Sequence, residues 1–351
     1  MSQLFNITCR KCSLAVCFML LCLNSFGQYD FTDVDKQIDL AKKSLGKNVA
    51  VMIYKDGKVV YKKETEEFKI TSPERIASCS KWLTAALVMT YVDEGKISLD
   101  DKVSKYLPIF ATYGKSYITI RHCLSHQTGI QQDHVSLASI MEHRKFASLE
   151  EEVNDFASKK EIAFNPGTGF FYGGTGLNIA ARVLEVVTKK KFDQLMNEKI
   201  LRPLGMRNTS FSSERAVNPS GGATSTAADY MNFLVMILNK GVFKDKRILS
   251  EKAVETMQQP QIKKEMIKYA PKAAEGLSYA LGEWVQEEDE NGNSVVVSCP
   301  GLFGTWPLID KCREYAFILF TKGLMGGEQK REIYFGIKKT IDEVIPSNCN
   351  K

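Results

Sequence analysis

The sequence lacks the patterns by which proteins bind nucleic acid. Its 351 residues carry a modest net charge of +6 at pH 7. We find no basic stripe with interleaved aromatic residues, no internal repeat and no low-complexity tract, so we expect no nucleic-acid partner. Histidine is scarce, with four residues in the chain. His122 and His126 are spaced for one helix face, but no acidic third partner lies nearby, so we interpret this pair as structural.

The sequence also lacks cysteine pairs with the spacing of a metal site. Of nine cysteines, four lie in the first 27 residues: Cys9, Cys12, Cys17 and Cys22. The other five are Cys79, Cys123, Cys299, Cys312 and Cys349. None of these five belongs to a Cys-x-x-Cys motif or a Cys/His cluster, so we assign no metal. An odd number leaves at least one free thiol. Cys299 and Cys312 flank an expected hairpin and are a candidate disulfide, although a strand's length separates them, and we expect Cys79 to be free.

The N-terminal apolar run, residues 12–23, is too short for a comfortable membrane span. Arg10 and Lys11 precede this run, and small residues follow it at 24–27. This order predicts a signal peptide over 1–27, a mature chain beginning near Gln28, and a periplasmic or secreted protein without a membrane span. The alternatives are a short buried helix, which the flanking charges disfavour, and a lipoprotein, which the large residues before Cys17 and Cys22 disfavour.

Strand-like segments gather at the two ends of the remaining chain. They lie at 49–54, 58–63, 279–286, 294–299, 304–309 and 315–321. Helical patterns fill the middle and the end, at 149–159, 175–189, 192–204, 227–239, 250–258 and 329–345. We therefore predict an α+β fold for residues 28–351, with one sheet built from both termini and flanked by helices. The α/β part covers about 28–85 and 260–351, and an inserted all-helical part covers about 86–259.

Ser78 and Lys81 lie at the predicted seam between these parts. Their three-residue spacing places both side chains on one helix face. A lysine whose pKa is lowered by burial can take the proton of a serine hydroxyl, and the apolar helix that follows Lys81 predicts such burial. The motif alone is weak, because Ser44 and Lys47 have the same spacing in a polar segment that ends in a glycine turn.

Five segments, in order along the chain, carry a family resemblance, and the first of them contains Ser78 and Lys81. They are residues 76–81, 118–129, 164–172, 203–211 and 222–229. In this order the chain resembles the serine β-lactamase and penicillin-binding-protein-like family, in particular the class C β-lactamase and related esterase branch. The resemblance implies a β-lactamase/transpeptidase-like fold with an antiparallel sheet.

The resemblance also implies a mechanism. Ser78 attacks a carbonyl and forms an acyl-enzyme, while Lys81 and Tyr172 share the proton transfers. A tyrosine near a lysine ammonium is expected to ionise below its free pKa of about 10. The backbone N–H of Ser78 and one from the strand near Leu302 form the oxyanion hole. Water then hydrolyses the acyl-enzyme, and no cofactor is needed.

Two substrate-binding positions depart from the family pattern. The Tyr-x-Asn motif is replaced by Tyr172-Gly173-Gly174, so Gly174 supplies no amide. The Lys-Thr-Gly or His-x-Gly motif is replaced by Cys299-Pro300-Gly301, followed by Leu302, so no cationic or imidazole side chain meets a substrate carboxylate. We therefore predict an exported serine hydrolase for a small ester, amide or peptide. Esterase or D-Ala-D-Ala carboxypeptidase-like activity is favoured over efficient β-lactamase activity. The alternative is a non-catalytic relative that binds peptides or cell-wall fragments.

Overall fold

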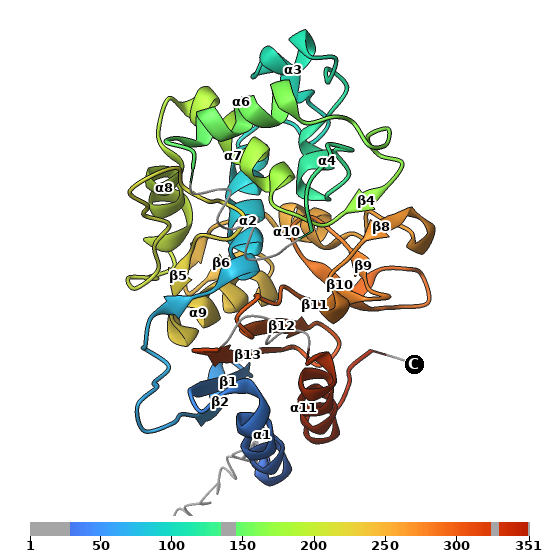
Figure 1. Ribbon diagram of the computed structural model, residues 1–351. Helices are drawn as coiled ribbons and strands as arrows, with labels where there is room; N and C mark the ends of the chain where they lie inside the picture. The colour runs from blue at the N-terminus through green and yellow to red at the C-terminus, as the bar shows by residue number, and fades with distance from the viewer. Residues whose placement is uncertain (1–28, 135–144, 324–329, 350–351) are drawn as a thin grey trace, which may run out of the picture.

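Strands from the two ends of the chain form one seven-stranded sheet. The computed structural model describes residues 29–134, 145–323 and 330–349, so the predicted signal peptide lies outside the described residues. The strand order is β2-β1-β13-β12-β11-β10-β9 (Figure 1). The strands are β1 (Val49–Lys55), β2 (Lys58–Lys63), β9 (Ser278–Tyr279), β10 (Trp284–Glu288), β11 (Ser294–Ser298), β12 (Trp306–Asp310) and β13 (Tyr315–Thr321). Every neighbouring pair is antiparallel, which confirms the predicted fold class.

Helices cover both faces of this sheet. Side chains of a strand alternate between its faces, and on β1 the residues Val49, Val51 and Ile53 face one core while Ala50 and Met52 face another. The first core is closed by α1 (Thr32–Leu45) and α11 (Arg331–Val344). The second is closed by α2 (Ser80–Asp93) and α9 (Ala227–Leu238), which separate the sheet from the remaining helices (Figure 1).

The remaining helices pack on the side of α2 that faces away from the sheet. They are α3 (Ile109–Thr112), α4 (Ile120–Leu124), α6 (Leu149–Lys159), α7 (Thr175–Thr188), α8 (Phe192–Met196) and α10 (Glu251–Gln258). The apolar face of α7 contacts α2, α4 and α6. Because α2 has helices or strands on every side, its residues from Ser80 to Tyr91 are all buried. The predicted boundaries between the two parts of the chain stay a prediction.

Three two-stranded sheets join segments near the seam. They are β3 (Glu74–Arg75) with β5 (Thr224–Ser225), β4 (Phe170–Phe171) with β8 (Ile267–Tyr269), and β6 (Val242–Phe243) with β7 (Lys246–Arg247). The β3–β5 pair ties the segment before Ser78 to a loop that lies about 150 residues further along the chain. These short pairs fix the approach of the chain to the site.

Two predicted elements are interrupted. The strand predicted over 279–286 is two antiparallel strands, β9 and β10, because the chain reverses at Gly282, whose φ is +85°. Ala280 closes this reversal by donating its N–H to the carbonyl of Glu283 at 2.9 Å. The helix predicted over 192–204 is α8 followed by a π-helical turn at Asn197–Leu201.

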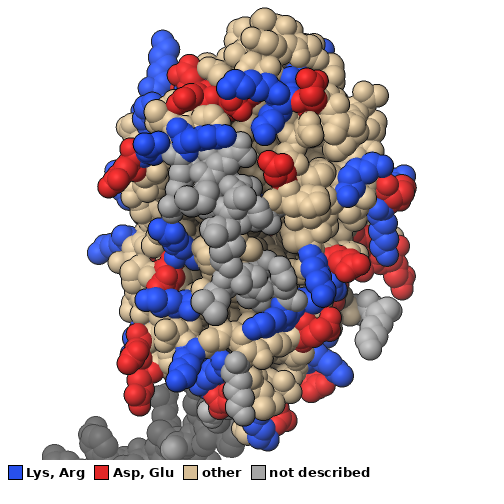
Figure 2. Space-filling model, viewed as in Figure 1, with Lys and Arg blue, Asp and Glu red and all other residues tan. Residues whose placement is uncertain are grey.

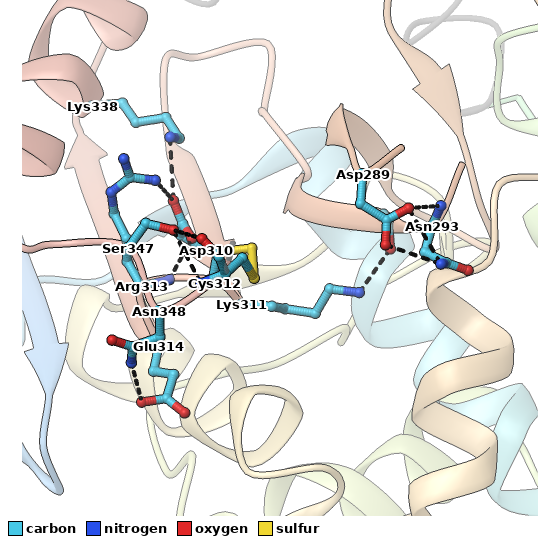
Figure 3. The surroundings of a disulfide bond; sticks show 12 residues. Asp289, Asn293, Asp310, Lys311, Cys312, Arg313, Glu314, Lys338, Ser347 and Asn348 are labelled. Carbon is cyan, nitrogen blue, oxygen red and sulfur yellow. Dashed lines mark hydrogen bonds and ion pairs between the residues drawn. A yellow bond between two sulfur atoms is a disulfide. The ribbon is translucent and has the colours of Figure 1, made fainter. Parts of the chain in front are cut away.

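A disulfide ties the C-terminal segment to the turn between β12 and β13. It joins Cys312 to Cys349 (Figure 3). Asn348 supports the junction by donating its N–H to the carbonyl of Cys312 at 2.7 Å. The candidate pair of Cys299 with Cys312 is therefore wrong. Cys299 is free and lies buried at the end of β11. The segment that follows α11 lies against Cys312, and the end of β11 does not.

The surface carries charges of both signs. On the face viewed in Figure 2, Lys and Arg side chains are interspersed with Asp and Glu side chains. Among the described residues, no helix is both long enough and apolar enough to cross a membrane.

Candidate active site

Ser78 lies on a tight turn that leads into the buried helix α2. The turn is a 3₁₀ segment, Ala77–Cys79, placed between strand β3 and α2. Ala77 has a φ of +44°, a left-handed conformation that an alanine adopts only at a cost in free energy. This conformation of Ala77 directs the Ser78 side chain toward Lys81. The predicted helix start is therefore confirmed, with one extra turn of 3₁₀ helix in front.

The amine of Lys81 lies within hydrogen-bond distance of the Ser78 hydroxyl. Nζ is 3.1 Å from Oγ of Ser78, and it donates to the carbonyl oxygen of Ser220 at 2.9 Å. Lys81 is only 3% exposed. Burial lowers the pKa of Lys81 from 10.5 to about 8, because removal from water penalises the ammonium form. A neutral amine that can accept the Ser78 proton is thus accessible near neutral pH.

Tyr172 completes the predicted trio but differs in its protonation. Its ring lies beside Lys81, with Nζ 4.8 Å from the ring centroid. Burial raises the pKa of Tyr172 well above its ordinary value, and hydrogen bonds with Ser78 and Trp284 oppose this shift only in part. Burial therefore works against the expectation that Tyr172 ionises below 10. The phenol is neutral and can donate or relay a proton.

An aromatic cluster encloses Tyr172. The ring of His126 lies 4.7 Å from the Tyr172 ring, and its Nε2 is 3.0 Å from the hydroxyl of Tyr279. Burial lowers the pKa of His126 well below its ordinary value, and the charge of Lys81 adds to this effect. A neutral His126 therefore packs behind Tyr172, whereas His122 accepts from the Thr119 N–H at the start of α4 at 3.3 Å.

The third motif lies behind the nucleophile. The Cys299 thiol is buried and donates to the carbonyl of Ser78 at 3.2 Å. A Cβ on Gly301 would approach the carbonyl oxygen of Ile76 to 2.3 Å, so only glycine fits there. Leu302 lies in the turn that joins β11 to β12, between the two predicted strands, and Gly301 and Thr305 close that turn with a 2.8 Å hydrogen bond.

Sequence reasoning missed the residues that hold Lys81 from the other side. Gly174 lies at the start of α7, and Asn178 follows one helical turn later. The side chain of Asn178 and that of Asn218 accept the N–H of Ser220, each at 3.1 Å. No local pattern marks this group, because Ser220 comes 139 residues after Lys81 in the chain.

These residues open onto one cavity of about 410 Å³, a size typical of small-molecule sites. Ser78, Lys81, Gly174 and Leu302 line it, whereas Tyr172 and Cys299 lie behind its walls. Its remaining lining includes four phenylalanines and both acidic and basic side chains: Phe146, Phe156, Phe211, Phe303, Arg75, Lys160, Arg215, Asp133, Glu152 and Asp155. Among the described residues, no group of three His, Cys, Asp or Glu side chains is placed to hold a metal ion.

Comparison with known proteins connects this geometry to a family. Residues 39–338 match the family described as Beta-lactamase. The D-alanyl-D-alanine-carboxypeptidase/endopeptidase AmpH of Escherichia coli (strain K12) is 25% identical over 258 residues, which cover 66% of each chain. The chain thus spans slightly less than two thirds of the length of AmpH. Beta-lactamase-like protein 2 of Dictyostelium discoideum is 27% identical over 256 residues, covering 61% of this chain and 46% of its own.

Solved structures show the same fold. The putative beta-lactamase of Bacteroides dorei DSM 17855 superposes with a TM-score of 0.79 at 29% identity, covering 90% of this chain and 99% of its own. EstCE1, a hydrolase with promiscuous acyltransferase activity, superposes with a TM-score of 0.73 at 18% identity, covering 88% and 98%. The predicted resemblance is confirmed: the chain belongs to the Beta-lactamase family of serine hydrolases.

Proposed function

We propose that the protein is an exported ester hydrolase that forms an acyl-enzyme on Ser78. One observation carries this proposal: the buried Lys81 amine, with a pKa of about 8, lies 3.1 Å from the Ser78 hydroxyl at the wall of the cavity. A serine becomes a nucleophile when such a base takes its proton. The lowered pKa leaves a useful fraction of Lys81 neutral at pH 7 to 8.

The first half-reaction uses the three predicted catalytic residues. Ser78 Oγ attacks the ester carbonyl carbon as its proton passes to Lys81 Nζ. The backbone N–H of Ser78 and one from the turn at Leu302 would stabilise the oxyanion, and each such donor typically contributes about 10²–10³ in rate. The proton then passes through the neutral Tyr172 hydroxyl to the leaving alkoxide, which departs as the alcohol.

The second half-reaction returns the enzyme to its starting state. A water molecule gives a proton to the same basic group and attacks the acyl carbonyl. The bond to Ser78 Oγ breaks, Ser78 recovers its proton, and the acid is released. The raised pKa of Tyr172 supports this role for a neutral phenol, because a proton relay requires a hydroxyl that keeps its proton at rest.

The lining of the cavity favours a neutral ester over a β-lactam. Gly174 offers no amide to a substrate acylamino group, and Cys299 is turned away behind Ser78. A charge-assisted hydrogen bond to a substrate carboxylate would contribute about 1.5–3 kcal/mol, and position 299 supplies none. The apolar side chains of Phe146, Phe156 and Phe211 suit the hydrocarbon part of an ester.

A direct kinetic comparison tests this function. The purified protein is expected to hydrolyse short-chain p-nitrophenyl esters and to turn over nitrocefin and a D-Ala-D-Ala peptide poorly. Intact mass after treatment with a fluorophosphonate should show one added group, located at Ser78 by peptide mapping. Efficient nitrocefin cleavage without esterase activity would overturn the choice of substrate.

The second candidate function is peptide or cell-wall-fragment binding without catalysis. The two lost recognition groups at 174 and 299 favour it, because they remove contacts that a family enzyme uses. An intact Ser78, Lys81 and Tyr172 favour the enzyme. Absence of ester hydrolysis, together with absence of labelling at Ser78, would select the binding function.

Export is part of the same proposal. The predicted signal peptide over 1–27 supports it, and so does the disulfide between Cys312 and Cys349, since disulfides persist mainly in oxidising compartments. N-terminal sequencing of the protein from its native host is expected to begin near Gln28. Retention of Met1 would contradict export by cleavage.

A further inference from the structure

The Lys81 amine is held from two sides. A neutral amine has two N–H donors and one lone pair. One N–H is directed to the Ser220 carbonyl at 2.9 Å, and the Ser78 hydroxyl lies at 3.1 Å. With a donor committed to Ser220, the lone pair is left for the proton of Ser78. The position of the Ser220 carbonyl therefore decides how well the base is aimed.

The Ser220 peptide is itself fixed by buried side chains. Its N–H donates to Oδ1 of Asn178 and to Oδ1 of Asn218, each at 3.1 Å, and its hydroxyl donates to Oδ1 of Asn218 at 2.8 Å. Asn178 is 2% exposed and donates in turn to Glu152 at 2.9 Å. The carbonyl of Ser220 belongs to the next peptide unit, whose N–H, on Gly221, donates to the carbonyl of Asn218 at 3.3 Å. Both peptide units that flank Ser220 are therefore held, and its carbonyl stays directed at Lys81.

The same serine fills the space beside Gly174. A Cβ on Gly174 would lie 2.7 Å from Oγ of Ser220, closer than real Cβ contacts come. Gly174 has a φ of −96°, so its backbone would accept a side chain and only the space is missing. A side chain at position 174 would therefore require the Ser220 hydroxyl to move from its place beside Asn218.

We propose that Asn178, acting through the Ser220 peptide, positions Lys81 in place of the absent side chain at Gly174. Asn178 and Ser220 are positioning residues, because neither touches the reacting Ser78 oxygen in the contacts described above. The inference rests on the proposed function, in which Lys81 is the base.

Asn178→Ala tests the anchor. The readout is the second-order rate of fluorophosphonate labelling at Ser78, followed from pH 6 to 10. Displacing a catalytic group by about 1 Å typically costs about 100-fold, and we expect a fall of that order in the plateau rate. The pH at which the labelling rate reaches half of its plateau should also fall, because the Lys81 ammonium loses a well-aimed carbonyl acceptor.

Asn232→Ala is the matched control. Asn232 also lies on a helix and hydrogen-bonds a main-chain group, donating to the carbonyl of Leu204 at 3.0 Å, and it does not line the cavity. The Asn232→Ala variant should keep the parent's labelling rate and its dependence on pH, even if its melting temperature is lower. An Asn178→Ala variant that folds and is labelled at the parent's rate, with the parent's dependence on pH, would overturn the inference.

A second pair of variants keeps the inference testable if Asn178→Ala fails to fold. Gly174→Asn alone should label slowly, because its side chain collides with Ser220. Gly174→Asn combined with Ser220→Gly should recover most of the loss, because the collision is gone and the new amide can reach Lys81. Equal rates for the single and double variants would contradict the replacement. A parent protein that is not labelled at all would instead refute the proposed function.

Discussion

The thiol of Cys299 donates a hydrogen bond to the main-chain carbonyl of Ser78 across 3.2 Å. The residue at the start of the third motif thus supports the nucleophile from behind and does not face the cavity. The carbonyl of Gly282, 3.5 Å away, is a second acceptor for the Cys299 thiol. Cys299 therefore belongs to the packing under the catalytic turn.

The three free thiols in the described part of the chain should resist modification in the folded protein. Cys79, Cys123 and Cys299 are buried, and burial raises the pKa of each, that of Cys299 to about 12. Alkylation needs an exposed thiolate. Peptide mapping after iodoacetamide treatment at pH 8 should find these thiols unmodified until guanidinium is added. Rapid modification of Cys299 in the folded protein would show that the turn opens.

Ser78→Ala should abolish labelling by a fluorophosphonate and leave the fold intact. The change removes only one hydroxyl, whose hydrogen-bond partners are Lys81 at 3.1 Å and Tyr172, so the melting temperature should stay within a few degrees. Lys81→Met should reduce the labelling rate almost as far, because residues that act as a unit do not contribute additively. Mass spectrometry measures both. A Ser78→Ala variant that labels at the parent's rate would exclude Ser78 as the nucleophile.

Esterase activity should rise with pH through about 8. Only neutral Lys81 accepts the Ser78 proton, and the pKa of Lys81 is about 8. Below that pH, kcat/KM should increase about tenfold per pH unit, and above it should level off. Steady-state rates between pH 6 and 10 check this profile. A profile in which kcat/KM levels off near pH 6 would point to a different base.

Lys81→Met should stabilise the protein at pH 7. The folded pKa of Lys81 is about 8 and the ordinary value is 10.5. At pH 7 the lysine is charged in both folded and unfolded states, so the folded protein bears the full cost of the buried ammonium. Between pH 8 and 10.5 the unfolded chain binds more protons, and the stability of the parent rises with pH by about 3 kcal/mol. The advantage of Lys81→Met, measured by urea unfolding, should therefore shrink as the pH approaches 10.5.

Cys349→Ser should lower stability, because it opens the cross-link to Cys312. The two cysteines are 37 residues apart in sequence, and closing a loop of this size restricts the unfolded chain by about 4 kcal/mol at most. Thermal unfolding of the parent with and without reductant provides the comparison. Reductant should lower the melting temperature of the parent and leave that of Cys349→Ser unchanged. An identical melting temperature for parent and variant would contradict a structural role for the disulfide.

The parts that sequence reasoning predicted well depend on local patterns. The strands at 58–63 and 315–321 begin and end at the residues predicted from their strand-like runs. The buried helix after Ser78 follows from its continuous apolar run. The position of Ser78 and Lys81 on one face needs only the period of a helix.

The parts that it missed depend on contacts between distant segments. The Ser220 carbonyl reaches Lys81 from 139 residues away, and no spacing rule covers such a distance. The partner of Cys312 depends on where α11 delivers the C-terminal segment. The raised pKa of Tyr172 reflects burial by an aromatic cluster drawn from β4, β9 and β10, which cannot be read from the residues beside it.

The antiparallel pairing of β1 with β13 also constrains how the protein folds as it is made. Val49 emerges early from the ribosome, whereas its partner Thr321 is among the last residues of the sheet to appear. At a synthesis rate of about 5–20 residues per second, β1 waits tens of seconds for this partner. Only β2 can pair with β1 during that interval, because the other five strands of the sheet follow the helical segments in the chain. Chains that stop before β13 leave this edge of β1 unpaired, so they should stay sensitive to proteases.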